Sequence, residues 1–372
     1  MPEIVIVIEG LGGGGAQRVA TALANRWSRE GRGVAVVTLS ESETDFFSLN
    51  SKVKRRVAGG TEISKNLIAG LVANFRRVKA LRKIFREECP RVVVGFGAQI
   101  NIVVILAASF LDARVVISER NNPVRQSFGR VWDALRRALY RFSDVVTANS
   151  GAAIEAMRSY VPSEKLVLLP NPPPEPPGRE PSPEPVVLAV GRLHPQKAHD
   201  VLISAFSRIS TKFPDWSLVI LGEGDLRGDL ESQVVDLGLA GRVQLPGQIE
   251  DPYRFYLGAG VFALPSRYEG SSNALLEAMS CGLPVVVSDA CLGSVGLVED
   301  GISGLVVRSG DVDSLAGALD RLIEGEDFRV RMGVAARDKI SRYRDSNVFA
   351  EWEQTLFDEV SPKSPKLEGS VS

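Results

Sequence analysis

Short runs of β-branched and other apolar residues alternate with helical patterns along most of the chain. Residues 3–8 (EIVIVI) are followed by a helical pattern at 16–30 and by a second apolar run at 33–39 (GVAVVTL). The same succession returns around residues 185–191 (PVVLAVG) and 216–222 (WSLVILG). Apolar runs of strand length separated by helices are typical of βαβ units, in which helices cover both faces of a parallel sheet. The chain is therefore predicted to have an α/β fold.

A proline-rich segment at 170–185 (PNPPPEPPGREPSPEP) divides this series into two parts. Proline can neither join the interior of a sheet nor continue a helix, and proline-rich segments are semi-rigid. We therefore expect two doubly wound domains, at 1–170 and 186–345, with a linker at 171–185. In such domains ligands bind at the carboxyl ends of the strands. If the two domains face one cleft, their functional loops meet there.

The two halves of the chain carry opposite charge. Residues 1–170 contain 25 Lys and Arg against 15 Asp and Glu, whereas the remainder contains 19 against 30. This asymmetry indicates an anionic partner for the first half. The three cysteines are too few and too scattered for a disulfide framework or a zinc site, so a reducing compartment fits best. The first residues run directly into an apolar segment and a glycine loop, so we expect a buried strand there instead of a signal peptide.

The glycine loop after the first apolar run is Gly10-Leu11-Gly12-Gly13-Gly14-Gly15. Gly10, Gly12 and Gly15 satisfy the GxGxxG pattern, and Glu41 could bind a ribose, which would suggest a dinucleotide-dependent oxidoreductase. Four consecutive glycines satisfy such patterns by chance. What they do provide is a loop whose amides can approach a ligand phosphate at a helix N-terminus; the alternative is a plain tight turn.

Residues 66–88 (NLIAGLVANFRRVKALRKIFREE) combine apolar positions at helical spacing with a stripe of cations. The cations are Arg76, Arg77, Lys79, Lys83 and Arg86. A basic amphipathic helix can lie on an anionic membrane surface or hold diphosphate groups, or it can simply present a solvated face. Nucleic acid is not expected, because no stacking platform or known module accompanies the charge.

A second strand-end loop reads Gly191-Arg192-Leu193-His194-Pro195-Gln196-Lys197. Arg192 and Lys197 could both face one diphosphate, the first as a bidentate fork and the second as a point charge, although a basic loop can also arise by chance. His194 and His199 have no metal-ligand spacing around them and are interpreted as polar loop residues.

The strongest motif is Glu269-Gly270-Ser271-Ser272-Asn273-Ala274-Leu275-Leu276-Glu277. A helix is expected to start near Ser272 and to stop at Gly282. Its N-terminus would offer free amides to a phosphate, and Glu277 would lie further along the axis. Two carboxylates at this spacing can bind hydroxyl groups on either side of a diphosphate, or they can be ordinary surface and helix-start acids.

These residues resemble the E-x7-E signature of retaining GT-B glycosyltransferases of family GT4. Gly191-Arg192 with Lys197, Gly222-Glu223-Gly224 and Pro246-Gly247 follow in the same order, and the resemblance covers nearly the whole chain. The glycine loop and Ser118-Glu119-Arg120-Asn121-Asn122-Pro123 look most like bacterial enzymes that add hexose or N-acetylhexosamine to lipid-diphosphate-linked glycans. The resemblance implies a GT-B fold, with a last helix within 346–372 that crosses back to the first domain.

The resemblance also implies a role for each motif. Arg192 and Lys197 would stabilise the donor diphosphate, and Glu269 would contact the donor sugar. The remaining donor-binding residues would be Gly14, Gly15, Gly191, Gly222, Gln248, Ile249, Gly270, Ser271, Ser272, Asn273 and Glu277. The acceptor diphosphate or the membrane would contact the basic helix, Arg120 and Asn121.

In one respect the chain departs from many relatives, which carry a histidine near the donor sugar in the first domain. Here no histidine precedes His194, and Glu119 is expected to take over part of that role. The only DxD motif, Asp311-Val312-Asp313, is expected to cap a helix instead of binding a metal. We therefore expect chemistry without a metal or other cofactor.

The leading hypothesis is a retaining glycosyltransferase that uses a UDP-sugar and a polyprenyl-diphosphate-linked or other glycan acceptor. It would work in the cytoplasm, peripherally on the inner face of the membrane. The alternatives are the same chemistry on a soluble acceptor, the oxidoreductase suggested by the glycine loop, and a nucleotide-sugar-binding protein without turnover.

Overall fold

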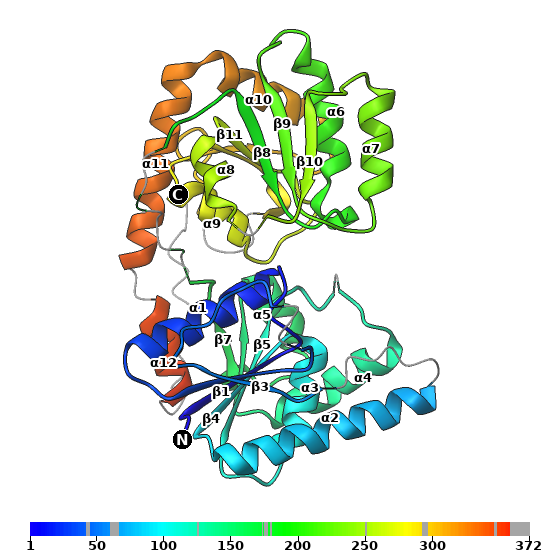
Figure 1. The fold of residues 1–372 in the computed structure, drawn as a ribbon, viewed down its shortest axis with the longest axis vertical. Coiled ribbons are helices and arrows are strands. Elements are labelled where there is room, and N and C mark those ends of the chain that lie inside the picture. The colour runs from blue at the N-terminus through cyan, green and yellow to red at the C-terminus, as the bar shows by residue number, and fades with distance from the viewer. Residues whose placement is uncertain are drawn as a thin grey trace. The chain divides into compact units, whose positions relative to one another are not determined.

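The computed structural model describes residues 1–41, 45–59, 67–124, 126–172, 174, 178, 181–249, 251–291, 297–345 and 348–357. The chain divides into an amino-terminal unit, Met1–Leu169 with Phe349–Ser372, and a carboxy-terminal unit, Pro170–Val348. Each unit contains a parallel sheet with helices on both faces (Figure 1). The expected α/β class is confirmed. Part of the expected linker at 171–185 lies outside the described residues.

Seven strands of the described amino-terminal unit form one parallel sheet in the order β3-β2-β1-β4-β5-β6-β7. They are β1 (Ile4–Ile8), β2 (Val34–Thr38), β3 (Lys54–Val57), β4 (Val92–Phe96), β5 (Arg114–Glu119), β6 (Val145–Ala148) and β7 (Leu166–Leu168). Every residue of β1, β2 and β4 is buried, as expected for central strands covered on both faces.

Helices α2, α3 and α4 cover one side of this sheet, and α1 and α12 cover the other (Figure 1). The helices of the unit are α1 (Gly15–Arg29), α2 (Leu67–Glu88), α3 (Ala98–Ala108), α4 (Arg130–Leu139), α5 (Gly151–Met157) and α12 (Val348–Phe357). Successive strand side chains point to opposite faces, so Val5 and Val7 pack with α3 in one core while Ile4, Ile6 and Ile8 face the other way.

The helix α12 packs on the amino-terminal unit although it follows the whole carboxy-terminal unit in sequence. The fully buried Trp352 stacks on Phe96 at the end of β4, with ring centroids 6.0 Å apart. On the surface, Nε of Arg32 donates a 2.6 Å hydrogen bond to Glu353. One face of the sheet is thus covered by a helix that follows the whole carboxy-terminal unit in sequence.

Six strands of the described carboxy-terminal unit form a second parallel sheet in the order β10-β9-β8-β11-β12-β13. They are β8 (Val186–Val190), β9 (Ser217–Leu221), β10 (Val243–Gly247), β11 (Val261–Leu264), β12 (Val285–Ser288) and β13 (Leu305–Val307). The order reverses between β8 and β11. In open α/β sheets this reversal leaves a crevice at the carboxyl ends of the two strands, where ligands bind.

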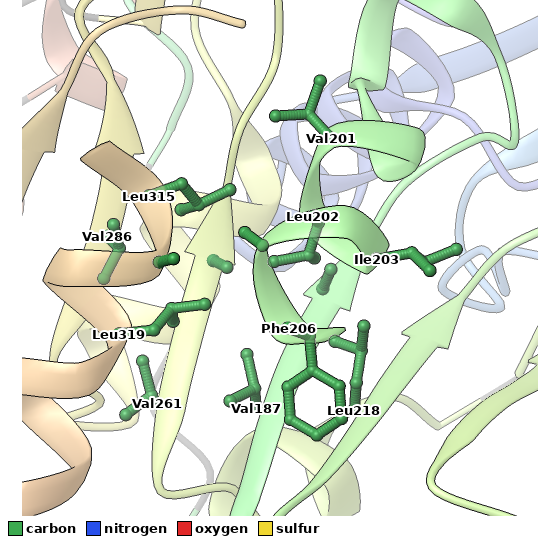
Figure 2. Packing of buried hydrophobic residues seen from close by; sticks show 14 of the residues in the cluster. Val187, Val201, Leu202, Ile203, Phe206, Leu218, Val261, Val286, Leu315 and Leu319 are labelled. Carbon is green, nitrogen blue, oxygen red and sulfur yellow. The ribbon is translucent and has the colours of Figure 1, made fainter. Parts of the chain in front are cut away.

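Two hydrophobic cores hold the helices of this unit against its sheet. The helices are α6 (His199–Ser210), α7 (Arg227–Asp236), α8 (Tyr253–Gly258), α9 (Asn273–Ser280), α10 (Val312–Glu324) and α11 (Glu326–Asp345). On one face, Phe206 of α6 lies beside Val187 and Leu218, and Leu319 of α10 lies beside Val261 (Figure 2). On the other face, α8, α9 and α11 contribute to the second core.

Within the part of the chain that the structure describes, we find no helix both long enough and apolar enough to cross a membrane.

Candidate active site

The site centres on Lys197 and Glu269, which follow the two strands at the reversal of the second sheet. Lys197 ends the loop after β8, and Glu269 lies in the loop after β11. Their side chains form an ion pair in which Nζ contacts Oε1. Ser266 adds a hydrogen bond of 3.0 Å from its hydroxyl to the same carboxylate oxygen. Only 16% of the lysine side chain and 9% of the glutamate side chain are exposed, so the pair is largely removed from water.

Two glycines let the loops after β8, β9 and β10 pass close to one another. The amide of Gly191 donates to Leu221 O at 2.9 Å, and that of Gly222 donates to Gly247 O at 2.9 Å. A Cβ at Gly222 would lie 2.0 Å from the carbonyl oxygen of Gly191, and the φ angle of Gly222 is +145°. Gly191 in turn packs over Lys197, since a Cβ there would be 3.1 Å from the lysine chain. The absence of side chains at Gly191 and Gly222 therefore lets the loops pack closely and fixes the place of the Lys197 side chain.

The loops after β8 and β11 are fastened directly to each other. The amide of Arg267 donates to Gln196 O at 2.8 Å, and Gln196 Nε2 donates to Tyr268 O at 3.0 Å. Arg267 also pairs with Asp200 at 2.7 Å. Partial burial raises the pKa of Asp200, but the bonds from Arg267 outweigh it and hold that pKa below its usual value. These contacts hold the loop of Lys197 against the loop of Glu269.

The helix α9 begins beside Glu269, as the sequence predicts. Ser272 is its N-cap, and the hydroxyl accepts a hydrogen bond from the Leu275 amide at 3.4 Å. Asn171 Nδ2 donates to Ser271 O at 3.1 Å and to Asn273 Oδ1 at 2.6 Å. Glu277, one turn further on, is 4% exposed. Asn171 was not singled out from the sequence, because it lies in the proline-rich segment, 100 residues before Ser271.

The other expected donor residues differ in their exposure. Arg192 is exposed and has no side-chain hydrogen bond or ion pair to another described residue. Gln248 is exposed after β10, and Ile249 packs against the core that contains α9. Gly270 is half-buried between Glu269 and Ser271.

The interpretation of His199 as a polar loop residue was wrong. It is the first residue of α6 and is 3% exposed. Burial, together with the charge of Lys197, lowers the pKa of His199 to about 4, so the imidazole is neutral at pH 7. Leu202, Ile203 and Phe206 follow His199 by three, four and seven residues, the spacing of one buried face of a helix. This pattern is visible in the sequence and could have predicted that His199 is buried. His194 instead accepts a hydrogen bond from the Gln196 amide at 3.2 Å within its loop.

Glu119 lies inside the amino-terminal unit, where its carboxylate accepts several hydrogen bonds. Tyr140 donates its hydroxyl to Oε2 at 2.8 Å, and Asn101 donates to that tyrosine oxygen at 3.1 Å. The amides of Arg120 and Asn121 also donate to Glu119. Burial raises the pKa of Glu119, and these bonds offset part of that effect. With 1% exposure, the carboxylate faces its own unit and not solvent.

The loops near Glu119 differ in their exposure. Arg120 is buried, with its guanidinium 5.8 Å from the Phe96 ring centroid and 6.0 Å from that of Trp352. Asn121 is half-buried. Gly14 is the N-cap of α1 and Gly15 is its exposed first residue.

The cations of α2 lie on its outer face. Arg76, Lys79, Lys83 and Arg86 are exposed, whereas Arg77 is half-buried and donates to Asn74 at 2.9 Å. Phe75 is 70% exposed and falls, with Val72, on the same helical face as the cations. The outer face of α2 thus joins cations to apolar side chains.

Family models match both units of the chain. Residues 14–172 match the glycosyl transferase 4-like domain, and residues 175–339 match the glycosyl transferases group 1 domain. A GDP-mannose-dependent alpha-(1-6)-phosphatidylinositol monomannoside mannosyltransferase of Mycolicibacterium smegmatis is 31% identical over 69% of this chain and 73% of its own length. The chain belongs to the GT4 family of GT-B glycosyltransferases. It is therefore an enzyme of sugar transfer, which excludes the oxidoreductase alternative.

Two further similarities extend over almost the whole glycosyltransferase. A Campylobacter jejuni alpha-1,4-N-acetyl-D-galactosaminyltransferase, named for a diNAcBac-PP-undecaprenol glycan, is 28% identical over 95% of this chain and 97% of its own. Anabaena HepE, solved with UDP and glucose, superimposes with a TM-score of 0.77 at 19% identity over 96% of this chain and 99% of its own. The latter similarity concerns the fold, and it confirms the GT-B architecture.

Proposed function

We propose that this glycosyltransferase moves a hexosyl or N-acetylhexosaminyl group from a UDP-sugar to a lipid-diphosphate-linked glycan, with retention of configuration and without a metal. The name of the Campylobacter relative supports the acceptor class, and the UDP bound to HepE supports the donor. The observation that carries the proposal is the enclosed ion pair of Lys197 with Glu269 at the reversal of the sheet.

The donor would bind by replacing one partner of this ion pair. Its diphosphate would draw Lys197 away from Glu269, which frees the carboxylate for hydroxyls of the donor sugar. Arg192 is exposed beside the same loop and would add a bidentate contact to the diphosphate. The amides at the start of α9, near Ser272 and Asn273, would bind a phosphate oxygen with help from the helix dipole. Glu277 would then bind the ribose, and Gln248 and Ile249 would lie near the base.

The chemistry follows from the charges that develop when the bond from sugar to phosphate breaks. The diphosphate becomes more negative and the anomeric carbon more positive. The α9 amides are fixed before reaction, and Lys197 and Arg192 would contact the diphosphate once the donor is bound, so all three would stabilise the leaving group. We propose that the acceptor hydroxyl attacks from the leaving-group face and passes its proton to a phosphate oxygen.

We assign Glu119 a positioning role in place of the sugar contact expected from the sequence. Its carboxylate accepts the amides of Arg120 and Asn121 and so fixes the loop after β5. That loop, with Gly14 and Gly15 after β1, would face the acceptor or the donor phosphate at the carboxyl edge of the first sheet.

The outer face of α2 would hold the protein at the membrane. Arg76, Lys79, Lys83 and Arg86 would approach anionic headgroups or the acceptor diphosphate, while Phe75 would enter the apolar layer. A cytoplasmic location on the inner face of the membrane follows from this proposal.

A thermal-shift screen with UDP, GDP and their sugars tests the donor, because a ligand that binds the native state raises its melting temperature. We expect a shift with UDP that persists in EDTA. A shift with GDP alone would assign the donor class named for the Mycolicibacterium relative instead. A shift abolished by EDTA would contradict metal independence.

Transfer to a polyprenyl-diphosphate-linked glycan then tests the reaction. The anomeric signal of the product in NMR should have the configuration of the donor sugar. Transfer only to a soluble glycan, or an inverted product, would overturn the acceptor or the stereochemical assignment respectively.

A further inference from the structure

An open cavity of about 590 Å³ lies along α4 on the amino-terminal unit. One face of the helix and the residues that follow it form the wall. Its lining includes Arg130, Ala134, Arg137, Ala138, Arg141 and Tyr160. Arg130 and Arg137, seven residues apart, lie on the same side of α4, and Arg141 lines the cavity from the short 3-10 helix Tyr140–Phe142 that follows. None of the roles proposed above uses this cavity.

The cavity is strongly cationic. The guanidinium groups of Arg130, Arg137 and Arg141 are exposed, and none has an ion pair with another described residue. The single acid in the lining, Asp133, accepts a 2.5 Å hydrogen bond from Ser127 and pairs with Arg136 at 3.0 Å. Because this one carboxylate is already paired with Arg136, the three arginines leave an excess of positive charge in the cavity.

Tyr160 also lines the cavity. Its hydroxyl oxygen is buried and has no hydrogen-bond partner among the described residues. Burial raises the pKa of Tyr160 to about 12, so the hydroxyl keeps its proton at neutral pH. Because this oxygen is closed to solvent, the donors that a ligand in the cavity can reach are the guanidinium groups of the arginines.

Exposed apolar side chains stand beside the cationic wall. Val131 and Leu135, on the next face of α4, are 58% and 37% exposed, and Phe142, directly after Arg141, is 68% exposed. A free phosphate would gain nothing from these side chains. A phosphate attached to an acyl or prenyl chain would gain from both features, because the cations meet the phosphate and the apolar side chains meet the hydrocarbon.

We propose that this cavity binds the phosphate of an anionic membrane lipid, with Val131, Leu135 and Phe142 entering the apolar layer. The site is separate from the stripe on α2, although both helices cover the same face of the sheet (Figure 1). Binding here needs neither a sugar donor nor a glycan acceptor, so the proposal stands or fails independently of the transfer reaction.

The test is co-sedimentation of the full chain with phosphatidylcholine vesicles that contain phosphatidylglycerol. The triple variant Arg130→Gln/Arg137→Gln/Arg141→Gln should lower the affinity for these vesicles by roughly tenfold or more. A matched control, Arg308→Gln/Arg331→Gln/Arg342→Gln, removes the same charge from exposed positions of the other unit. It should leave vesicle binding within about twofold. Equal losses in the two triple variants would mean that only net charge matters and would overturn the proposal, as would no loss in the first.

A second pair of measurements separates a lipid from a free phosphate. The variant Val131→Ser/Leu135→Ser keeps the arginines and should still lose vesicle affinity. The lipid proposal is wrong if two results occur together: the serine variant binds vesicles normally, and inorganic phosphate raises the melting temperature of the wild type but not of the arginine variant. The cavity would then bind a free anion. All altered side chains in these variants are exposed, so unchanged melting temperatures without ligand serve as the folding control.

Discussion

Lys197 and Glu269 form an ion pair although 72 residues separate them and they follow different strands. In this pair, the charged group that each side chain would offer to the donor is already bound to the other side chain. In the proposed reaction, a diphosphate that binds Lys197 would release Glu269, so donor binding and exposure of the carboxylate would be coupled.

Replacement of Glu269 by Gln separates the two roles. Lys197 loses its competing carboxylate, so we expect UDP to bind several-fold more tightly by calorimetry. The contact to the donor sugar is weakened, so kcat should fall about 100-fold or more. Glu324→Gln, which removes an exposed partner of Lys212, is the control and should change neither quantity. Weaker UDP binding in the Glu269 variant would contradict the proposed exchange.

Replacement of Arg192 by Ala should affect ligand binding and not folding. The side chain is exposed and has no polar partner among the described residues, so the free energy of unfolding should change by less than about 0.5 kcal/mol. KM for the donor should rise and kcat should fall. Lys197→Ala is the variant to compare with it. This substitution also leaves Glu269 without its cation, so it should lower the melting temperature. A large loss of stability in the Arg192 variant would show a structural role instead.

Gly222→Ala should destabilise the carboxy-terminal unit. The new methyl group would lie 2.0 Å from the carbonyl oxygen of Gly191, at a φ of +145° that alanine rarely adopts. We expect a loss of roughly 2 kcal/mol or more in urea unfolding, together with weaker donor binding. Gly317→Ala is the matched control: it lies in α10 with open space around it and should raise stability by about 1 kcal/mol. Equal effects of the two substitutions would refute the packing argument.

His199 should make stability fall in mild acid. Its folded pKa of about 4 lies below its ordinary value of 6.5, so the unfolded chain binds the proton more readily between these values. The stability it contributes is present above pH 6.5 and is lost as the pH falls towards 4, by up to about 3 kcal/mol. In urea unfolding at pH 7 and 4.5, His199→Leu should lack this part of the decrease. Parallel curves for the two proteins would contradict it.

The strands and most helices could be predicted because their signals are local. The apolar run 4–8 and the centre of the run 186–190 are buried in the structure, and the helix after Glu269 begins at the predicted cap, Ser272. Asp311 likewise caps α10, through a 2.9 Å bond from the Ser314 amide. Each of these features depends on neighbouring residues alone.

The contacts that build the site could not be predicted in the same way. The sequence placed Lys197 and Glu269 on strand-end loops, but their pairing depends on which strands are neighbours in the sheet. Glu119 was expected to take over part of a histidine's role near the donor sugar, but its buried environment is set by Tyr140, which comes from another part of the chain. Asn171 offered no motif, and its contact with the start of α9 arises only in the folded unit.

The stacking of Trp352 on Phe96 has a consequence for biosynthesis. A ribosome makes the strands of the amino-terminal unit first, yet the side chain that covers Phe96 emerges only after the entire carboxy-terminal unit. The later unit, Pro170–Val348, is continuous and has all its residues before α12 is complete. The first unit must therefore keep an uncovered apolar face until the whole of Pro170–Val348 and α12 have been made, which makes that face the one that a chaperone would have to shield.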